Sequence, residues 1–240
     1  MTQAPSSPRQ ARGLHGLSNA GDGSTPPVKA ERRSPANGSP FTEHYARRDI
    51  VIEEAEPANH LFKVVAGTLR ATKLLPDGRR HITSFVSPGD FFGFTNNGHY
   101  LQTVDAIEDT ALIRYSRRSL EHLMETDPQT RYCLYIEMRK ALLAADEHLL
   151  LLGRKTAVER VAAFLLSLAG HAPNTGSCGP KEIVLRMNRS DIADYLGLSV
   201  ETVSRTFTRL CRRKIISLPT PERVVLVRRD ALQRIGDCLS

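Results

Sequence analysis

Tryptophan is absent from this chain of 240 residues, aromatic residues make up only 6% of it, and cysteine occurs four times. The cysteines are single, and none forms a C-x-x-C or Cys/His pair with the spacing of a zinc or iron–sulfur site. In a reducing compartment we expect buried, reduced thiols at Cys133, Cys211 and Cys238. Cys178 is the exception, because it lies in a loop of Gly, Pro, Ser and Asn where an exposed, redox-active thiol is the alternative.

Long apolar runs are also missing, and no segment approaches the roughly 20 residues that span a bilayer. The first 23 residues lack the apolar stretch of a secretory signal. We therefore expect a cytoplasmic protein with no membrane partner. Glycine-rich nucleotide loops, H-E-x-x-H and G-x-S-x-G are absent as well, so we expect no enzymatic activity.

What the chain has in excess is positive charge. Lys and Arg number 33 against 26 Asp and Glu, which gives a net charge of +7 and a pI of about 9.5. Such a balance points to an anionic partner, either nucleic acid or a membrane surface.

Composition divides the chain into parts. Residues 1–40 contain six Pro, five Gly and six Ser and few large aliphatic residues, so we expect a disordered tail. Residues 41–127 hold short β-rich runs separated by turns such as Pro76-Asp77-Gly78, which predict a small antiparallel barrel or roll. Residues 128–153 form the next part, a helix from Thr130 to Leu152 that we expect Gly153 to interrupt as a hinge.

The expected helix carries an apolar stripe with coiled-coil spacing. Its members recur at intervals of three and four residues: Leu134, Met138, Leu142, Ala145, Leu149 and Leu152. Two interpretations remain open, a stripe that packs on its own roll and a seam between two copies of the chain. Because the roll is small and the helix long, we favour a homodimer seam.

Residues 154–240 have the layout of a winged helix. An amphipathic helix, a short strand at Lys181–Arg186, a helix–turn–helix over about 187–210 and two further strands follow one another. Within the helix–turn–helix, Ala193 suits a close helix crossing, Gly197 a tight turn, and Val203 the shared core. A unit of this kind used only for protein contact is the alternative to one that binds double-stranded DNA.

The stretch SVETVSRTF, residues 199–207, has two faces when it is helical. Val203 and Phe207 belong to an apolar face, while Glu201, Ser204 and Arg205 share another. Glu201 and Arg205 could be only a solvated ion pair. In a recognition helix, however, Arg reads guanine, Glu accepts from cytosine, Ser serves several base edges, and Val200 can meet a thymine methyl. The candidates for phosphate contact are Arg189, Arg209, Arg212 and Arg213.

The β-rich run with Pro88-Gly89-Asp90, the long helix and MNRSDIADYLGLSVETVSRTFTRL resemble the CRP/FNR superfamily of bacterial transcription regulators. The resemblance covers about 45–235 and implies an α+β fold: a cyclic-nucleotide-binding-like β-roll, a dimerisation helix and a C-terminal winged helix–turn–helix. The pattern Glu-x-x-Ser-Arg is similar to that of the FNR and FixK branch. It implies that Glu201, Ser204 and Arg205 read the half-site TTGAT in TTGAT-N4-ATCAA.

Departures from the superfamily narrow the expected role. No cysteine precedes Cys133, so the iron–sulfur cluster of oxygen-sensing members is not expected. The segment 93–106, GFTNNGHYLQTVDA, lacks the Gly-Glu and the Arg-Ser pair of members that bind cyclic nucleotides. This double loss is similar to the FixK type, which implies no cofactor and a role as activator of microaerobic respiration and nitrogen-fixation genes. RNA polymerase is the implied partner, with the loop Leu75–His81 as a candidate contact.

Two alternatives remain open at this point. The first is a sensor whose roll binds a metabolite, haem or nitric oxide through haem, for which His60, His81 and His99 would be the available histidines. The second is a repressor, because the position of the binding site on a promoter decides the sign of regulation.

Overall fold

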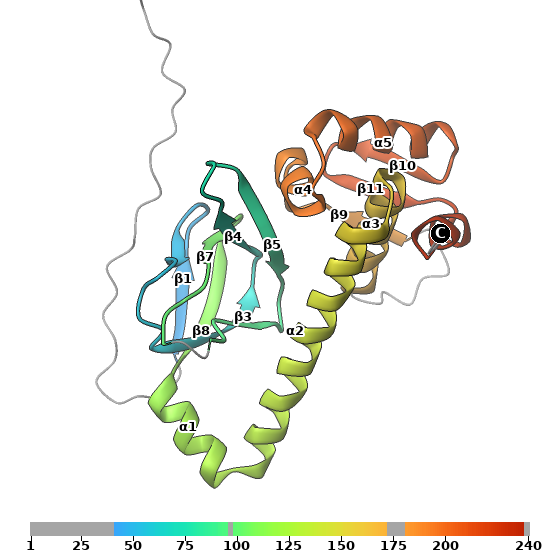
Figure 1. The fold of residues 1–240 in the computed structure, drawn as a ribbon. Helices are drawn as coiled ribbons and strands as arrows, with labels where there is room; N and C mark the ends of the chain where they lie inside the picture. Colours follow the sequence, from blue (N-terminus) through green and yellow to red (C-terminus); the bar gives the residue numbers. More distant parts are fainter. Residues whose placement is uncertain (1–40, 96–97, 172–180, 238–240) are drawn as a thin grey trace, which may run out of the picture.

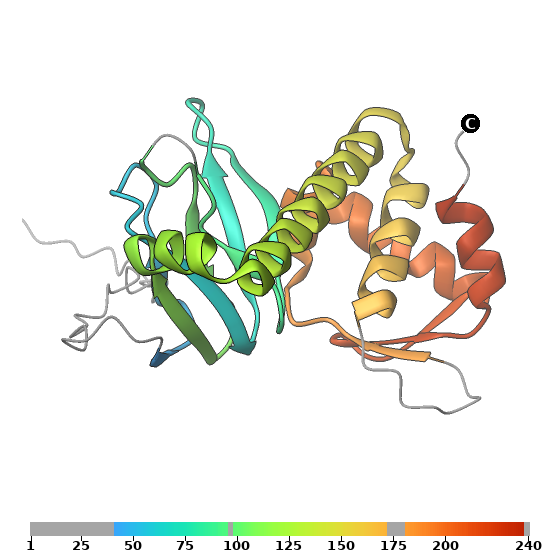
Figure 2. The same ribbon diagram turned by 90° about the horizontal axis from the view of Figure 1, so that it is seen from below.

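The computed structural model describes residues 41–95, 98–171 and 181–237. The expected disordered tail and the exceptional Cys178 lie outside these residues. A β-roll and a C-terminal helical module lie at the two ends of a long helix, α2 (Pro128–Arg154), which crosses the molecule (Figure 1). The view from below shows that the two modules also touch one another beside α2 (Figure 2).

The β-roll consists of two antiparallel sheets that enclose an apolar core. Its strands are β1 (Phe41–Tyr45), β2 (Ile50–Ile52), β3 (His60–Ala66), β4 (Leu69–Leu74), β5 (Arg80–Val86), β6 (Phe91–Phe92), β7 (Thr103–Ala106) and β8 (Thr110–Ser116). The strand orders are β1-β8-β3-β6 and β2-β7-β4-β5. Buried and less buried residues alternate along β4, as in a half-buried strand, and Leu69 and Ala71 enter the core. The roll expected from the sequence is confirmed.

Two helices join the roll to the C-terminal module. The first, α1 (Arg117–Thr126), was not expected from the sequence; the Ser116 side chain caps it by accepting from the amide of Ser119. The second, α2, begins at Pro128 because Asp127 caps the amides of Gln129 and Thr130. It continues through Gly153 and ends one residue later at Arg154, so the break expected at Gly153 lies at Lys155 and Thr156.

The apolar stripe of α2 divides into two groups. Leu134 is only 5% exposed, and Leu152 packs against the core of the C-terminal module, so these two already have partners within the chain. The middle of the stripe is exposed: Met138, Leu142, Ala145 and Leu149. The seam predicted between two copies is therefore shorter than the sequence spacing indicated.

In the C-terminal module, a three-stranded sheet and several helices pack around a second apolar core. Its elements are α3 (Ala157–His171), β9 (Lys181–Val184), α4 (Arg189–Leu196), α5 (Val200–Arg212), β10 (Ile216–Thr220), β11 (Arg223–Leu226) and α6 (Arg229–Gly236). The sheet order β10-β11-β9 and the helix pair α4–α5 confirm the winged helix–turn–helix. Helix α6 was not expected; it packs closely on α3, where a Cβ at Gly236 would lie 2.8 Å from Leu166.

Two expectations about the surface can be compared with the described residues. Cys133 is exposed on α2, so the expectation of a buried thiol is wrong there, whereas Cys211 is partly buried. None of the described helices combines the length and the apolar character that a bilayer crossing requires.

Candidate nucleic-acid interface

Helix α5 is amphipathic, and its two faces have different environments. It begins at Val200 because the Ser199 hydroxyl accepts from the amide of Thr202. Val203, Phe207 and Leu210 are at most 2% exposed and join α5 to the core. The opposite face is therefore turned to solvent along its whole length.

A tight turn fixes α5 relative to α4. Gly197 has a φ of +61°, a left-handed conformation that favours glycine, and its amide donates to the Ala193 carbonyl. Arg160 of α3 donates to the carbonyls of Leu196 and Leu152, at 2.8 and 2.9 Å. One guanidinium thus caps the ends of α4 and α2 together. No sequence pattern indicates this role of Arg160, because its partners lie on two other helices.

The base-reading candidates lie at the exposed N-terminal part of α5. Glu201, Ser204 and Arg205 are all exposed, and Val200 is 40% exposed. Hydrogen bonds from the backbone amide of Glu201 and from Ser199, together with the charge of Arg205, lower the pKa of the Glu201 carboxyl. Glu201 is therefore a pure acceptor at neutral pH, suited to an amino group on a base edge.

The C-terminal half of α5 carries a basic surface. Arg205, Arg209, Arg212 and Arg213 line one open hollow, together with Ser204 and Thr208. All four arginines are exposed. Four cationic groups beside one reading face form a surface that is complementary to a phosphate backbone.

Arg189, the remaining candidate for phosphate contact, lies on α4 and not on α5. Its guanidinium carbon lies 3.6 Å from the centre of the Phe207 ring, and its Nη2 donates to the Pro221 carbonyl at 3.4 Å. Burial lowers the pKa of Arg189. The side chain therefore ties α4 to the core of α5 and to the turn of the β10–β11 hairpin, and it is less available for phosphate than the arginines of α5.

The histidines considered for a sensor each make a contact within the fold. His60 lies beside Phe62, and burial together with Arg114 lowers its pKa. His81 lies 6.0 Å from the His148 ring, and its Nδ1 contacts the Asp194 carbonyl at 3.1 Å. His99 forms an isolated bridge with Pro57. Across the described ranges, no three His, Cys, Asp or Glu side chains are grouped to hold a metal ion.

The segment 93–106 does not fit a cyclic nucleotide phosphate. It contains no Lys or Arg. Tyr100 fills the roll interior, where its hydroxyl donates to the His60 carbonyl at 2.9 Å. Arg117 reaches this segment but donates to the carbonyls of Ala58 and Gly93. A bound phosphate would lack a charged partner from this segment.

Comparisons with known proteins agree with this architecture. Residues 42–127 match the cyclic nucleotide-binding domain, and residues 159–235 match the Crp-like helix-turn-helix domain. The chain is 42% identical to "Nitrogen fixation regulation protein FixK" of Azorhizobium caulinodans, over 80% of this chain and 77% of that protein. It is 34% identical to the protein of the same name from Rhizobium meliloti, over 83% of this chain and 86% of that one.

Solved structures give the same result. "The Structure of FixK2 from Bradyrhizobium japonicum" matches with a TM-score of 0.77 and 37% identity, covering 84% of this chain and all of that chain. Both modules and the long helix between them therefore have counterparts in a homologous protein of known structure. The chain belongs to the CRP/FNR family of DNA-binding transcription regulators.

Proposed function

We propose that this protein is a homodimeric, FixK-like activator that binds TTGAT-N4-ATCAA without an added effector. The observation that carries the proposal is the exposed face of α5, which presents an ionised Glu201, the Ser204 hydroxyl and the Arg205 guanidinium together. Relatives named nitrogen fixation regulation proteins support a role at genes for nitrogen fixation and microaerobic respiration.

Each reading residue has a distinct task in this proposal. Arg205 donates two hydrogen bonds to O6 and N7 of guanine, Glu201 accepts from N4 of a cytosine, and Ser204 contacts a neighbouring base. Val200 supplies an apolar contact to a thymine methyl. Arg209, Arg212 and Arg213 hold phosphates and contribute no sequence preference, and Arg189 acts mainly by supporting α5.

Two copies join through the exposed part of α2. Met138, Leu142 and Leu149 are between 53% and 67% exposed, an unusual fraction for large apolar side chains on one helix. If this apolar face of α2 packed against the same face of a second chain, its side chains would be removed from water. A two-fold dimer then places two recognition helices about 34 Å apart, the distance between successive major grooves on one side of DNA.

Activation requires a contact with RNA polymerase, for which the β4–β5 loop is our candidate. Leu74, the last residue of β4, is 65% exposed, and the Arg79 side chain in the loop is 77% exposed. The cofactor-free character of the proposal is supported by the segment 93–106, which contains no Lys or Arg that could pair with a phosphate.

The test is DNA binding by the untreated full-length dimer at one stated salt concentration. Binding to TTGAT-N4-ATCAA is compared with binding to a duplex in which the G·C pairs are swapped. We expect a preference of at least tenfold for the first duplex. Equal binding to both duplexes, or binding only after an effector is added, would contradict the proposal.

The seam is tested separately. Leu142→Glu combined with Leu149→Glu would place two carboxylates in each half of the interface. We expect sedimentation to show monomers at concentrations where the wild type is dimeric, with the far-ultraviolet spectrum unchanged. Glu substitution at Tyr132, another exposed α2 residue outside the stripe, is the control and should leave the dimer intact.

A further inference from the structure

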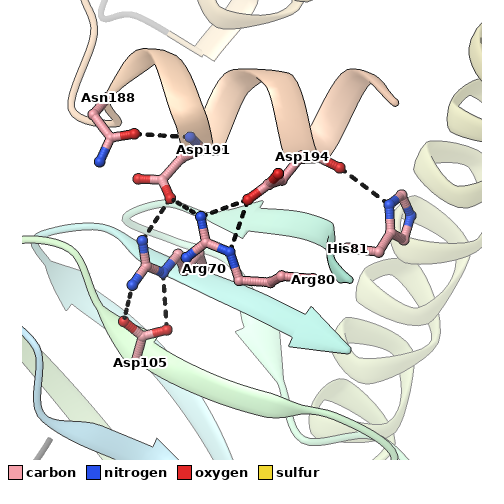
Figure 3. A network of polar contacts seen from close by, with 7 residues as sticks. All are labelled: Arg70, Arg80, His81, Asp105, Asn188, Asp191 and Asp194. Carbon is pink, nitrogen blue, oxygen red and sulfur yellow. Dashed lines mark hydrogen bonds and ion pairs between the residues drawn. The ribbon is translucent and has the colours of Figure 1, made fainter. Parts of the chain in front are cut away.

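A cluster of partly buried ion pairs joins the helix–turn–helix unit to the β-roll. Arg70 of β4 and Arg80 of β5 donate to the same oxygen of Asp191 on α4, at 2.6 and 2.8 Å (Figure 3). Arg80 also pairs with Asp194 at 2.6 Å. We name these four side chains, Arg70, Arg80, Asp191 and Asp194, the clamp.

Two further residues, Asp105 and Asn188, hold the clamp in position. Asp105 of β7 holds the Arg70 guanidinium with two bonds of 2.9 and 3.0 Å, and it fixes the direction in which Arg70 points. Burial raises the pKa of the Asp105 carboxyl, and Arg70 acts in the opposite direction. At the other side, Asn188 caps α4 by accepting from the amide of Asp191. The carboxylate of Asp191 is only 3% exposed, so the loss of one arginine would leave it with a single partner, and the loss of both would strand a buried charge.

Aromatic contacts extend the same junction. The Phe85 ring of β5 lies 5.2 Å from the Tyr195 ring of α4, and Tyr195 stacks on His148 of α2 at 4.3 Å. Helix α4 is therefore held by the roll and by α2 at once. Because α2 also carries the proposed dimer seam, direct contacts connect α4 to both the roll and the seam.

The clamp leaves the reading surface free. It binds the side of α4 that faces the roll, while Glu201, Ser204 and Arg205 on α5 remain exposed. Ile192, Ala193 and Leu196 of α4 share a core with Val203 and Phe207, so α5 follows α4. The clamped arrangement is thus compatible with DNA binding and does not occlude the recognition helix.

We propose that Arg70 and Arg80 are positioning residues for DNA recognition, because through Asp191 and Asp194 they fix the helix–turn–helix unit on the roll. In this way they set the separation of the two recognition helices, and hence which half-site spacing the dimer accepts. This inference rests on the proposed function, since it needs α5 to read DNA. A unit released from the clamp samples several orientations, and its apparent affinity falls by the fraction that matches the palindrome.

The matched variants are Arg80→Gln and Arg79→Gln. Both remove one positive charge from the β4–β5 hairpin, but the exposed Arg79 pairs locally with Asp77, whereas Arg80 pairs across the junction. Each is measured on palindromes with spacers of two to six base pairs, and on the duplex with swapped G·C pairs. We expect Arg80→Gln to bind the four-base-pair spacer about tenfold more weakly and to lose spacer preference. Its preference for the correct half-site over the swapped one is expected to stay.

General destabilisation of the protein would not remove the spacer preference while leaving the half-site preference unchanged. Unfolding by urea is measured for both variants, and a partner variant, Asp194→Asn, is combined with Arg80→Gln. If the pair acts as a unit, the double variant is no weaker on the four-base-pair spacer than Arg80→Gln alone. A spacer profile of Arg80→Gln equal to that of Arg79→Gln would overturn the proposal.

Failure of the proposed function gives a different result. In that case the wild-type protein itself shows no preference between the correct and swapped half-sites. Hydrogen exchange of the DNA-free protein then decides on the clamp. Faster exchange in α4 and β5 for Arg80→Gln than for Arg79→Gln supports it, and equal exchange overturns it.

Discussion

The two helices of the helix–turn–helix carry charge in opposite ways. On α4, Asp191 and Asp194 are satisfied by arginines of the β-roll, and Asp191 is almost fully buried. On α5, the arginines at 205, 209, 212 and 213 are exposed on a common surface. Charges that are paired inside the protein fix geometry, while charges left on a rigid, exposed face remain available to an outside ligand. The difference separates positioning from recognition within about 25 residues of chain.

Both helices depend on the apolar contact between them, so loss of that contact is expected to have the largest effect. Phe207 is 2% exposed and packs between α4 and α5, with Arg189 over its ring. We expect Phe207→Ala to lower the free energy of unfolding by about 3–5 kcal/mol, because it removes a large buried ring and leaves a cavity. Denaturation by urea measures the change. Val200→Ala, on the exposed side of α5, is the control and should change stability little.

The recognition side is tested by Arg205→Ala. We expect it to weaken binding to TTGAT-N4-ATCAA by about 1–3 kcal/mol and to abolish discrimination at the guanine, because the two hydrogen bonds to that base are lost. Titration of labelled duplexes at constant salt measures both effects.

Arg212→Ala is the matched control for Arg205→Ala. It removes the same charge from the same helix but should weaken binding to all sequences alike and reduce the salt dependence. If Arg205→Ala behaved in the same way as Arg212→Ala, the assignment of Arg205 to base reading would be wrong.

The local parts of this design were predictable from sequence. Ala193, Gly197 and Val203 lie within eleven residues, so their spacing alone defines the turn. The amphipathic pattern of α5 likewise identified its exposed face. Gly153 indicated the end of α2 to within one residue, and the packing of Leu151 and Leu152 keeps the last turn helical.

The missed features depend on partners that are distant in sequence. Helix α1 has ten residues and none of them is buried, although Ser116 and Asp127-Pro128 mark its ends. The clamp joins Arg70 to Asp191 across 121 positions. No periodicity connects such residues, and only the packing of α4 on the roll brings them together.

The junction behind α4 also predicts a modest dependence on pH. His148 is half-buried against Tyr195, and its pKa is lowered from 6.5 to about 4 by burial, with smaller contributions from His81 and Arg160. The unfolded chain binds a proton at this position below pH 6.5, while the folded chain does so only near pH 4. Stability from the neutral ring is therefore complete above pH 6.5 and is lost as the pH falls toward 4.

Comparison of the wild type with His148→Phe, which keeps an aromatic ring but cannot titrate, isolates this contribution. Between pH 7 and pH 5 we expect the wild type to lose about 1 kcal/mol more unfolding free energy than the variant, a value reduced for the partial exposure of the ring. Urea denaturation at the two pH values measures it. Equal losses would mean that the imidazole is solvated in the folded protein, and that α4 is held by the contact of Tyr195 with Phe85 of β5 without help from a neutral His148.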